Sequence, residues 1–418
     1  MIWKRKKYLD KIYKALETEK LVLLLGTRQV WKTSLLELLR QELVWEKYFY
    51  SFEDDFSRIE FVSKQDFINY FTLSLWVNFY KEGYFFIDEF QYIRNWEQIL
   101  KSLYDDTTIK IQLIVTGSGL WTYWEDHSWT LVGRWQEIYV YPFDFFEFLE
   151  IRWLDTSRIN FTGLSDSIHT LIEPYYKEYL SYGWYPAVIK AQSKQEKILE
   201  LEKIISRYLE RDIQFFLQKD EFIHFKKFFH YLQGQIWNLV KKEAIWEYLW
   251  IKVRQVEKYL NILEKTLFIS RVYPFFQDKS KEYSSLPKFY FWDVGIGNFL
   301  EKSFEYRDNA WKVVENFIFN ELQKNKTFNS DEIKVYKKIT KSEIDFIYDG
   351  LDRCIPIEVK SGNKKSIPKI FYSFEETYTH KTSHYIISTQ SYSKQDFLDT
   401  KEVYFIPNWY VGRFLQEK

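Results

Sequence analysis

One short segment near the N-terminus restricts the possible folds of this chain most. The segment GTRQVWKT (26–33) matches the pattern G-x-x-x-x-G-K-[ST] at every fixed position except the second glycine, where Trp31 stands. It follows the apolar run LVLLLG (21–26), which is typical of a buried parallel strand, and it precedes KTSLLELLRQEL (32–43), which has helical periodicity. A strand, a loop and a helix in this order predict a phosphate-binding loop.

The chemistry of such a loop assigns a role to each of its residues. Consecutive backbone N–H groups surround the β-phosphate of a nucleotide at the helix N-terminus, the lysine reaches the β- and γ-phosphates, and the threonine hydroxyl ligates magnesium. We therefore predict ATP and Mg²⁺ as cofactors, with Thr33 as a metal ligand. The predicted nucleotide-binding residues are Gly26, Thr27, Arg28, Gln29, Val30, Trp31, Lys32, Thr33 and Ser34. A bulky indole at position 31 would obstruct the loop.

The composition suggests an explanation for that indole. The chain has 17 Trp but only 13 Gly, whereas glycine normally makes up about 7% of residues. Trp31, Trp184 in YGWYP and Trp250 in EYLWI stand where a tight backbone favours glycine. One interpretation is that UGA codons read as glycine in the organism have been translated as tryptophan. The alternative is a chain rich in aromatic residues, since Phe and Tyr are also abundant. The coding DNA at these positions decides between the two.

Two further strands predict the rest of a nucleotide site. YFFIDEF (84–90) and IKIQLIVTGS (109–118) are apolar and are separated by a helical stretch, which indicates a parallel α/β sheet. Asp88 and Glu89 end the first of them, at the strand end where such sheets bind ligands. We expect Asp88 to hold magnesium through water and Glu89 to polarise the attacking water. The alternative is a solvated acidic turn.

Two polar residues beyond these strands are candidates for the γ-phosphate. Ser118 follows LIVTG at the tip of its strand and is the preferred sensor, with Thr116 the weaker candidate. Arg134, in LVGRW, is a candidate arginine finger that stabilises transition-state charge. An isolated arginine is also common as a surface or salt-bridge residue, so both interpretations of Arg134 stay open.

The rest of the chain separates into helical and mixed regions. The stretch from about 140 to 235 is helical and predicts a lid or connector. Residues 240–275 predict two helices and a strand, as in a helix-turn-helix or winged helix, whose second helix VRQVEKYLNILEK enters a nucleic-acid groove or simply packs. From about 310, a helix, three strands, a helix and a further strand predict a compact α/β domain.

Seven segments, taken in order, resemble one protein family. They are GTRQVWKTSLL, FFIDEFQ, TGSGL, LVGR, YPFDFFEF, YGWYP and ENFIFNEL. They resemble an archaeal-type AAA ATPase family of bacteria and archaea, most specifically at 26–34, 85–91 and 133–148. The resemblance covers most of the chain and implies a P-loop ATPase domain followed by a region similar to restriction endonucleases. The family pattern has glycine where Trp31 and Trp184 stand, and recoding explains both departures.

The C-terminal strands carry the residues that a PD-(D/E)xK nuclease needs. Asp345 in SEIDFIY precedes Glu358 in IPIEVKSG by 13 residues, which is enough for a hairpin. Glu358 and Lys360 share a face because strand side chains alternate. In nucleases of this group the acids ligate Mg²⁺ and the lysine orients the water, and Glu315 on the preceding helix is the usual fourth member. The alternative is a charged solvent face that only docks a partner.

These observations combine into one expected architecture. The fold class is α/β: a P-loop AAA-like parallel-sheet ATPase domain (1–150), a helical lid (151–235), a winged-helix-like region (236–300) and a restriction-endonuclease-like domain (301–418). We expect an ATP-hydrolysing protein that acts on nucleic acid, with DNA as a candidate partner, and a homo-oligomer whose arginine finger acts in trans. The alternative function is a nucleotide-switched DNA- or protein-binding module without cleavage activity.

Charge and cysteine content indicate which partners and which cellular compartment to expect. Lys plus Arg and Asp plus Glu each number 59, so nucleic-acid contact requires a local basic patch. Cys354 is the single cysteine, which permits no internal disulfide and fits a reducing compartment. No signal peptide or membrane-spanning run is evident in the sequence, so the expected location is the cytoplasm, with no membrane partner.

Overall fold

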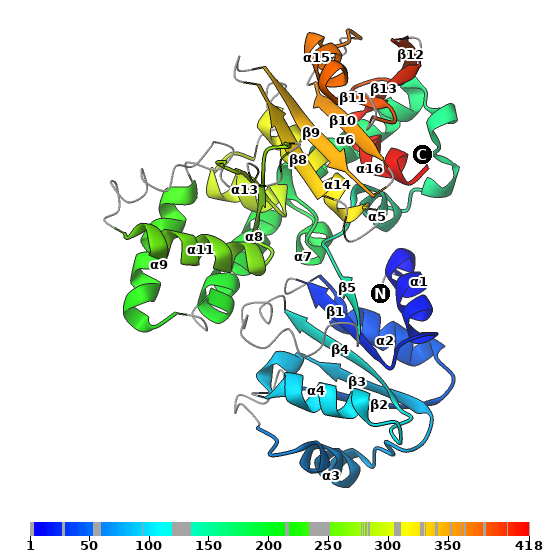
Figure 1. Ribbon diagram of the computed structural model, residues 1–418, viewed down its shortest axis with the longest axis vertical. Coiled ribbons are helices and arrows are strands. Elements are labelled where there is room, and N and C mark those ends of the chain that lie inside the picture. Colours follow the sequence, from blue (N-terminus) through cyan, green and yellow to red (C-terminus); the bar gives the residue numbers. More distant parts are fainter. Residues whose placement is uncertain are drawn as a thin grey trace. The chain divides into compact units, whose positions relative to one another are not determined.

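The chain divides into two compact units, residues 1–142 with 265–267 and residues 143–264 with 268–418 (Figure 1). The computed structural model describes residues 4–26, 30–52, 60–93, 95–118, 135–213, 217–233, 251–276, 278, 280, 282, 285–304, 311–326, 330, 332–338, 342–351, 353–360, 362, 365–378, 382–398 and 400–417. The finer division into four domains stays a prediction.

The first unit is built on a five-stranded parallel sheet. Its strands are β1 (Leu21–Gly26), β2 (Glu46–Ser51), β3 (Gly83–Asp88), β4 (Gln112–Ser118) and β5 (Gln136–Tyr139). Their order is β2-β3-β4-β1-β5, and all neighbours run parallel. Every residue of β1 and β3 is buried, as expected for strands covered on both faces. This confirms the predicted parallel α/β sheet.

Helices cover both faces of this sheet (Figure 1). The helices are α1 (Lys6–Leu16), α2 (Lys32–Glu42), α3 (Lys64–Leu75) and α4 (Trp96–Asp105), with a short 3-10 turn η1 (Phe90–Tyr92) after β3. The buried side chains of α3 and α4 share one apolar cluster with alternate residues of the strands, such as Leu23 and Phe85. The helices α1 and α2 contact β1 outside that cluster. Because β1, β3 and β4 run parallel, their carboxyl-terminal residues Gly26, Asp88 and Ser118 lie at the same edge of the sheet.

The second unit begins with helices, as predicted for 151–235. They are α5 (Phe145–Ile151), α6 (Asp166–Tyr182), α7 (Pro186–Lys190), α8 (Lys194–Arg207) and α9 (Lys219–Gln233), with 3-10 turns η4 (Thr156–Arg158) and η5 (Phe161–Gly163) and a π-helical turn η6 (Tyr208–Ile213). Capping boxes start α5 at Asp144 and α8 at Ser193, where the side chain and a glutamate satisfy free N–H groups.

One helix and a strand pair follow in the region expected to resemble a winged helix. The helix α11 (Val253–Lys265) coincides with the predicted second helix, and the strands β6 (Ile269–Val272) and β7 (Lys288–Phe291) pair antiparallel before α13 (Val294–Leu300). The apolar face of α11 is buried, and the Tyr259 ring packs edge-to-face against the Phe225 ring of α9. This supports the packing interpretation of α11. The first predicted helix falls mostly on 234–250, outside the described residues.

A six-stranded mixed sheet forms the C-terminal part of the unit. Its strands are β8 (Glu332–Lys337), β9 (Glu343–Asp349), β10 (Cys354–Val359), β11 (Tyr385–Thr389), β12 (Ser393–Phe397) and β13 (Lys401–Pro407), in the order β12-β13-β11-β10-β9-β8. The strands β8, β9 and β10 alternate in direction, while β10, β11 and β13 are parallel.

Two helices cover opposite sides of this mixed sheet. The helix α15 (Lys369–Tyr378) shares an apolar cluster with Ile344, Ile387 and Phe405. The helix α14 (Trp311–Lys324) contacts β8, β9 and β10, and its Phe319 ring lies 6.3 Å from the Phe346 ring. A 3-10 turn η7 (Asn408–Tyr410) and α16 (Val411–Glu417) complete the unit. The α/β character predicted for this region agrees with the structure, which has three strands after α15 where the sequence predicted one. A separate domain here stays a prediction.

Candidate functional site

Gly26 ends β1 at a point where only glycine fits. A Cβ atom built there would lie 2.2 Å from the carbonyl oxygen of Val140. Six residues later Lys32 opens α2; its side chain is buried and its ammonium group donates to the Gly26 carbonyl at 3.0 Å. The Lys32 side chain therefore reaches back to Gly26, the first residue of the predicted phosphate loop. Thr27, Arg28 and Gln29 lie outside the described residues.

Trp31 has a backbone conformation that favours glycine. Its φ and ψ angles are 68° and 36°, in the left-handed region, at the N-cap of α2. A residue with a Cβ atom pays roughly 1–2 kcal/mol for this conformation, while glycine adopts it freely. The geometry thus agrees with the glycine that the loop pattern requires at this position.

The acidic end of β3 is joined to the loop helix and to β4. The Thr33 hydroxyl donates to Oδ2 of Asp88 at 2.9 Å, and the Thr116 hydroxyl donates to Oδ1 of Asp88. The Oγ1 atom of Thr116 also accepts from the backbone N–H of Glu89 at 3.2 Å. Thr116, the weaker candidate for a γ-phosphate sensor, thus contacts both the Asp88 carboxylate and the Glu89 backbone. The side chain of Ser118 is not described, although its backbone pairs with Gly26.

Burial affects the ionisation of Asp88. Desolvation raises the pKa of Asp88 above its usual value, and the hydrogen bonds from Thr116 and Thr33 oppose that rise. Glu89 is buried and adopts a left-handed φ of 53°, and the Gln91 amide donates to its carboxylate. Unfavourable backbone geometry of this kind is found mainly where the surrounding structure holds a residue for function. A carboxylate, a hydroxyl and an ammonium group at one strand edge fit Mg²⁺ and a nucleotide phosphate.

Arg5 is a component of this region that the sequence reasoning missed. Its guanidinium group is buried and donates to the carbonyl oxygens of Val30 at 3.3 Å, Tyr141 at 2.7 Å and Pro142 at 3.5 Å. Arg5 therefore ties the end of the phosphate loop to the segment after β5. The run KRKK at 4–7 gave no signal, because a basic N-terminal helix normally lies in solvent.

The second candidate site lies on the β9–β10 hairpin. Asp345 of β9 accepts from the backbone N–H of Val359 at 2.7 Å, so the predicted hairpin places Asp345 beside Glu358. Glu358 pairs with Lys360. Glu315 of α14 accepts from the Tyr290 hydroxyl at 2.5 Å and pairs with Lys288 of β7. The structure thus brings together all four residues that the sequence predicted, with Lys288 and Tyr290 added.

The electrostatics of this site show that the three acids interact. Burial raises the pKa of Asp345 well above its usual value, and the Glu358 and Glu315 carboxylates raise it further. Burial also raises the pKa of Glu358, while the Lys360 ammonium lowers it. The Oε2 atom of Glu358 is buried and has no hydrogen-bond partner among the described residues. Such an atom is costly unless a cation or donor satisfies it.

The acids are not arranged as a three-carboxylate metal centre. Over the part of the chain that the structure describes, no group of three or more His, Cys, Asp or Glu side chains is placed to hold a metal ion. Lys288 instead pairs with Glu315, and Lys360 pairs with Glu358. The unsatisfied Glu358 oxygen and the buried Asp345 carboxylate fit a divalent cation chemically, and these lysines would have to turn aside to admit it.

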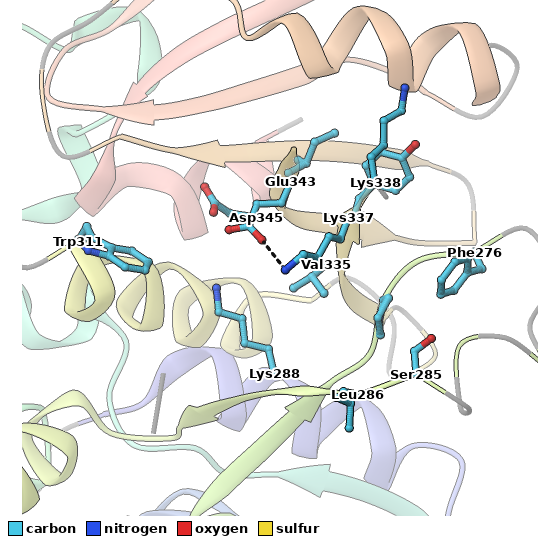
Figure 2. A pocket seen from close by; sticks show the side chains of 13 residues that line it. Phe276, Ser285, Leu286, Lys288, Trp311, Val335, Lys337, Lys338, Glu343 and Asp345 are labelled. Carbon is cyan, nitrogen blue, oxygen red and sulfur yellow. Dashed lines mark ion pairs between the residues drawn. The ribbon is translucent and has the colours of Figure 1, made fainter. Parts of the chain in front are cut away.

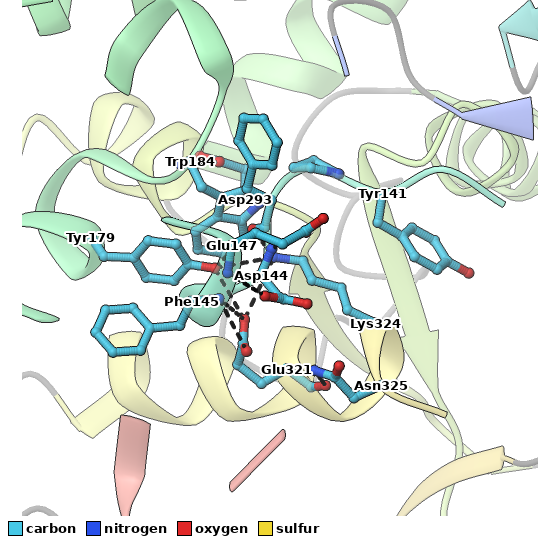
Figure 3. Close-up of polar contacts among 12 residues, drawn as sticks. Tyr141, Asp144, Phe145, Glu147, Tyr179, Trp184, Asp293, Glu321, Lys324 and Asn325 are labelled. Carbon is cyan, nitrogen blue, oxygen red and sulfur yellow. Dashed lines mark hydrogen bonds and ion pairs between the residues drawn. The ribbon is translucent and has the colours of Figure 1, made fainter. Parts of the chain in front are cut away.

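A further buried polar network joins three of the family-like motifs (Figure 3). Glu321 of ENFIFNEL accepts from the backbone N–H of Phe145 at 3.3 Å and from the Tyr179 hydroxyl at 3.0 Å. Lys324 donates to the Phe143 carbonyl at 3.0 Å and lies 3.5 Å from the ring centre of Trp184. Trp184 is fully buried and has no left-handed backbone, so its geometry gives no sign of glycine. Trp250 lies outside the described residues.

The comparison with known families bears directly on the first unit. Residues 18–149 match the family model described as "AAA domain", a range that holds Lys32, Asp88 and Glu89. Residues 18–149 are therefore similar to AAA domains, which supports the P-loop and ATP-binding part of the resemblance.

The rest of the chain matches families without a described activity. Residues 173–306 match domain of unknown function DUF8612, and residues 312–409 match domain of unknown function DUF4143. Neither description names a winged helix or a nuclease, so both assignments stay predictions. Arg134 lies outside the described residues, and its role as a finger also stays a prediction.

Two curated relatives are similar over long stretches. An uncharacterized protein of Haemophilus influenzae is 23% identical over 419 residues, covering 97% of this chain and 98% of that protein. An uncharacterized protein of Methanocaldococcus jannaschii is 26% identical over 288 residues, covering 64% of this chain and 60% of that protein.

Solved ATPases are similar at a lower level. The Walker-type ATPase of Pyrococcus abyssi is 18% identical, with a TM-score of 0.45 over 72% of this chain and 96% of that one. The RuvB Holliday junction branch migration motor of Thermotoga maritima is 18% identical, with a TM-score of 0.32 over 64% and 89%. TM-scores of this size do not by themselves establish a shared overall fold.

Within the described residues, none of the helices has the length and apolar character of a membrane span.

Proposed function

We propose that the first unit hydrolyses ATP with Mg²⁺. The observation that supports this most is the hydrogen bonding of Asp88 to both Thr33 and Thr116 beside Lys32. Thr33 and Asp88 would hold the magnesium ion, directly and through water, and Lys32 would contact the phosphates. The magnesium ion would neutralise charge on the phosphates, while the Glu89 carboxylate accepts a proton from the attacking water.

The test is ATP turnover in the Trp31→Gly chain. Glu89→Gln in that background should keep ATP binding and lose hydrolysis, because the amide cannot accept the proton. Glu82→Gln, an exposed acid one residue before β3, is the matched control and should keep full turnover. Normal hydrolysis by Glu89→Gln would show that the general base is another group.

We propose that the second unit carries a nuclease-type site of the PD-(D/E)xK kind. Support comes from the adjacency of Asp345, Glu358 and Lys360 on one hairpin, from Glu315 on the neighbouring helix, and from the order of a helix, three strands, a helix and three further strands. Bound Mg²⁺ would activate water and stabilise the phosphorane. Asp345 and Glu358 would hold the ion, and Lys360 would orient the water once it leaves Glu358. ATP hydrolysis would then drive action on nucleic acid within a homo-oligomer.

Cleavage of DNA and RNA with Mg²⁺ or Mn²⁺, with and without ATP, tests this site. Asp345→Asn and Glu358→Gln should each abolish cleavage and leave ATP hydrolysis nearly intact, while Glu376→Gln, an exposed acid on α15, should cleave normally. If the Asp345→Asn variant still cleaves nucleic acid, the β9–β10 hairpin is not the catalytic site.

A second candidate function is a nucleotide-switched binding module. The observation in its favour is that Lys288 and Lys360 neutralise two of the acids, which suits a surface that binds without a metal. ATP turnover without cleavage under all of these conditions would support this alternative.

A further inference from the structure

A cavity in the second unit opens beside the buried Asp345 (Figure 2). It has a volume of about 540 Å³ and lies between the C-terminal end of β8, the segment that leads into β7, and the start of α14. The backbone N–H of Phe275 donates to the Val335 carbonyl of β8 at 2.6 Å. Pro274 and Phe276, on either side of Phe275, line the cavity next to β8.

The walls of this cavity are largely apolar. Pro274, Phe276, Leu286 and Val335 line it, with Asp345 among the polar residues. Cavities of about 300–1,000 Å³ with such walls and a few polar groups suit small planar ligands. Trp311 lines the cavity as well, and glycine at that position would widen it without changing the other walls.

The cavity has a local group of lysines, although acidic and basic residues are equal in number over the whole chain. Lys288, Lys337 and Lys338 all line the cavity. Lys337 approaches Glu343 at 3.8 Å with about half of each side chain exposed, and exposed pairs of this kind are weak. A phosphate group can therefore recruit Lys337 at little cost. Lys338, next to it at the end of β8, adds a second cation.

We propose that this cavity holds one unpaired base of a single-stranded DNA or RNA, with its phosphate at Lys337 and Lys338 and the neighbouring phosphate directed to Asp345. This inference rests on the proposed nuclease-type site and names its substrate class. A duplex keeps its bases stacked and presents only backbone and groove edges, so it cannot fill an apolar cavity without flipping a base. An unpaired strand offers both a free base face and a phosphate chain.

Binding measured in EDTA tests the inference separately from cleavage. The probe is a short oligothymidylate strand carrying one 2-aminopurine, compared with the same sequence in RNA and in a duplex, and followed by anisotropy and 2-aminopurine emission. We expect both single strands to bind at least about tenfold more tightly than the duplex, because only an unpaired base can enter the cavity and stack there.

Two variants and a matched control locate the site. Lys337→Gln with Lys338→Gln should weaken single-strand binding about tenfold and reduce its salt dependence. Leu286→Trp should fill the cavity and remove the change in 2-aminopurine emission. Lys394→Gln, a lysine of the same sheet that is 44% exposed and paired with Glu402, should bind as the parent does.

Three results would overturn the inference. They are equal or tighter binding of the duplex, normal binding by the double lysine variant, and unchanged emission in Leu286→Trp. Single-strand binding that depends on the cavity but is never followed by cleavage in Mg²⁺ or Mn²⁺ would instead remove the nuclease proposal and keep the binding site.

Discussion

The Thr33 hydroxyl donates a hydrogen bond of 2.9 Å to Oδ2 of Asp88, although the two residues are 55 positions apart. This bond places the predicted magnesium ligand of the loop helix directly on the acid that ends β3. Strand β4 lies between β1 and β3, and it contributes Thr116 to the same carboxylate. The two predicted motifs are thus parts of one site.

The first prediction concerns that contact. Thr33→Val should reduce the magnesium-dependent part of ATP affinity by about tenfold or more, because the valine has no oxygen for the metal. Thr33→Ser should retain it. Titration of ATP with and without Mg²⁺ measures the difference, and an unchanged magnesium effect in Thr33→Val would remove Thr33 from the metal site.

The second prediction concerns Arg5. Arg5→Ala should weaken ATP binding several-fold, because the Val30 carbonyl and the backbone at 141–142 lose their common donor. Lys4→Ala is the matched control, since Lys4 is largely exposed and pairs with Glu42. The ATP affinities of both variants check this. If the two variants bind alike, Arg5 does not organise the loop.

The third prediction concerns two exposed tryptophans at helix ends. Trp76 follows α3 with φ 55°, and Trp153 lies just beyond α5 with φ 65°. After each, the next backbone N–H donates back to a carbonyl of the helix, from Val77 to Phe71 at 3.2 Å and from Leu154 to Leu149 at 3.1 Å. Helices commonly end in this way with glycine at the left-handed position.

Trp76→Gly and Trp153→Gly should therefore each raise the free energy of unfolding by about 1 kcal/mol. Trp311→Gly is the control, because that exposed residue opens α14 without a positive φ, and glycine within a helix destabilises it. Thermal unfolding midpoints measure all three. A loss of stability at 76 and 153 would argue against glycine as the native residue there.

The fourth prediction concerns pH and Asp293. Full burial raises the pKa of this carboxyl to about 6 from 3.8, against the opposing N–H bonds of Trp184 and Ile296. A raised pKa favours the protonated folded state, so this stability is present below about pH 4 and is lost as the pH rises through about 6. The shift corresponds to roughly 3 kcal/mol.

Thermal unfolding of the parent and Asp293→Asn from pH 4 to 8 checks that sign. The parent should lose more stability over this range than the variant, which has no titrating group at 293. The asparagine of the variant keeps one acceptor for the N-cap, so the slopes are compared rather than the absolute midpoints. Parallel slopes would show that Asp293 does not titrate in this window.

Parts of this structure follow from the sequence, and others depend on tertiary context. Continuous apolar runs and helical periodicity predicted β1, β3, β4 and α14 to within a few residues. The strands β2 and β12 were missed because each is partly exposed and polar, and β5 has only four residues. All three carry little of the apolar signal that identifies a buried strand. The strand β13 was also missed, although its VYFIP run is apolar and buried.

The candidate sites show the same division. Spacing alone placed Asp345 near Glu358, because a hairpin has few geometries. The contact of Thr116 with Asp88 was not predicted, since it depends on the order of the strands. Arg5 was missed because its three carbonyl partners come from distant segments. The Glu358–Lys360 pair follows from their shared strand face, whereas Lys288 pairs with Glu315 through a contact that no spacing rule contains.

The most direct test of the central claim, nucleotide binding by the 26–34 loop, is a calorimetric titration of ATP in Mg²⁺. The account predicts saturable binding by the Trp31→Gly chain, affinity at least about tenfold lower when Lys32→Ala is added, and weaker binding when Trp31 is present. Equal affinity in all three chains would contradict it.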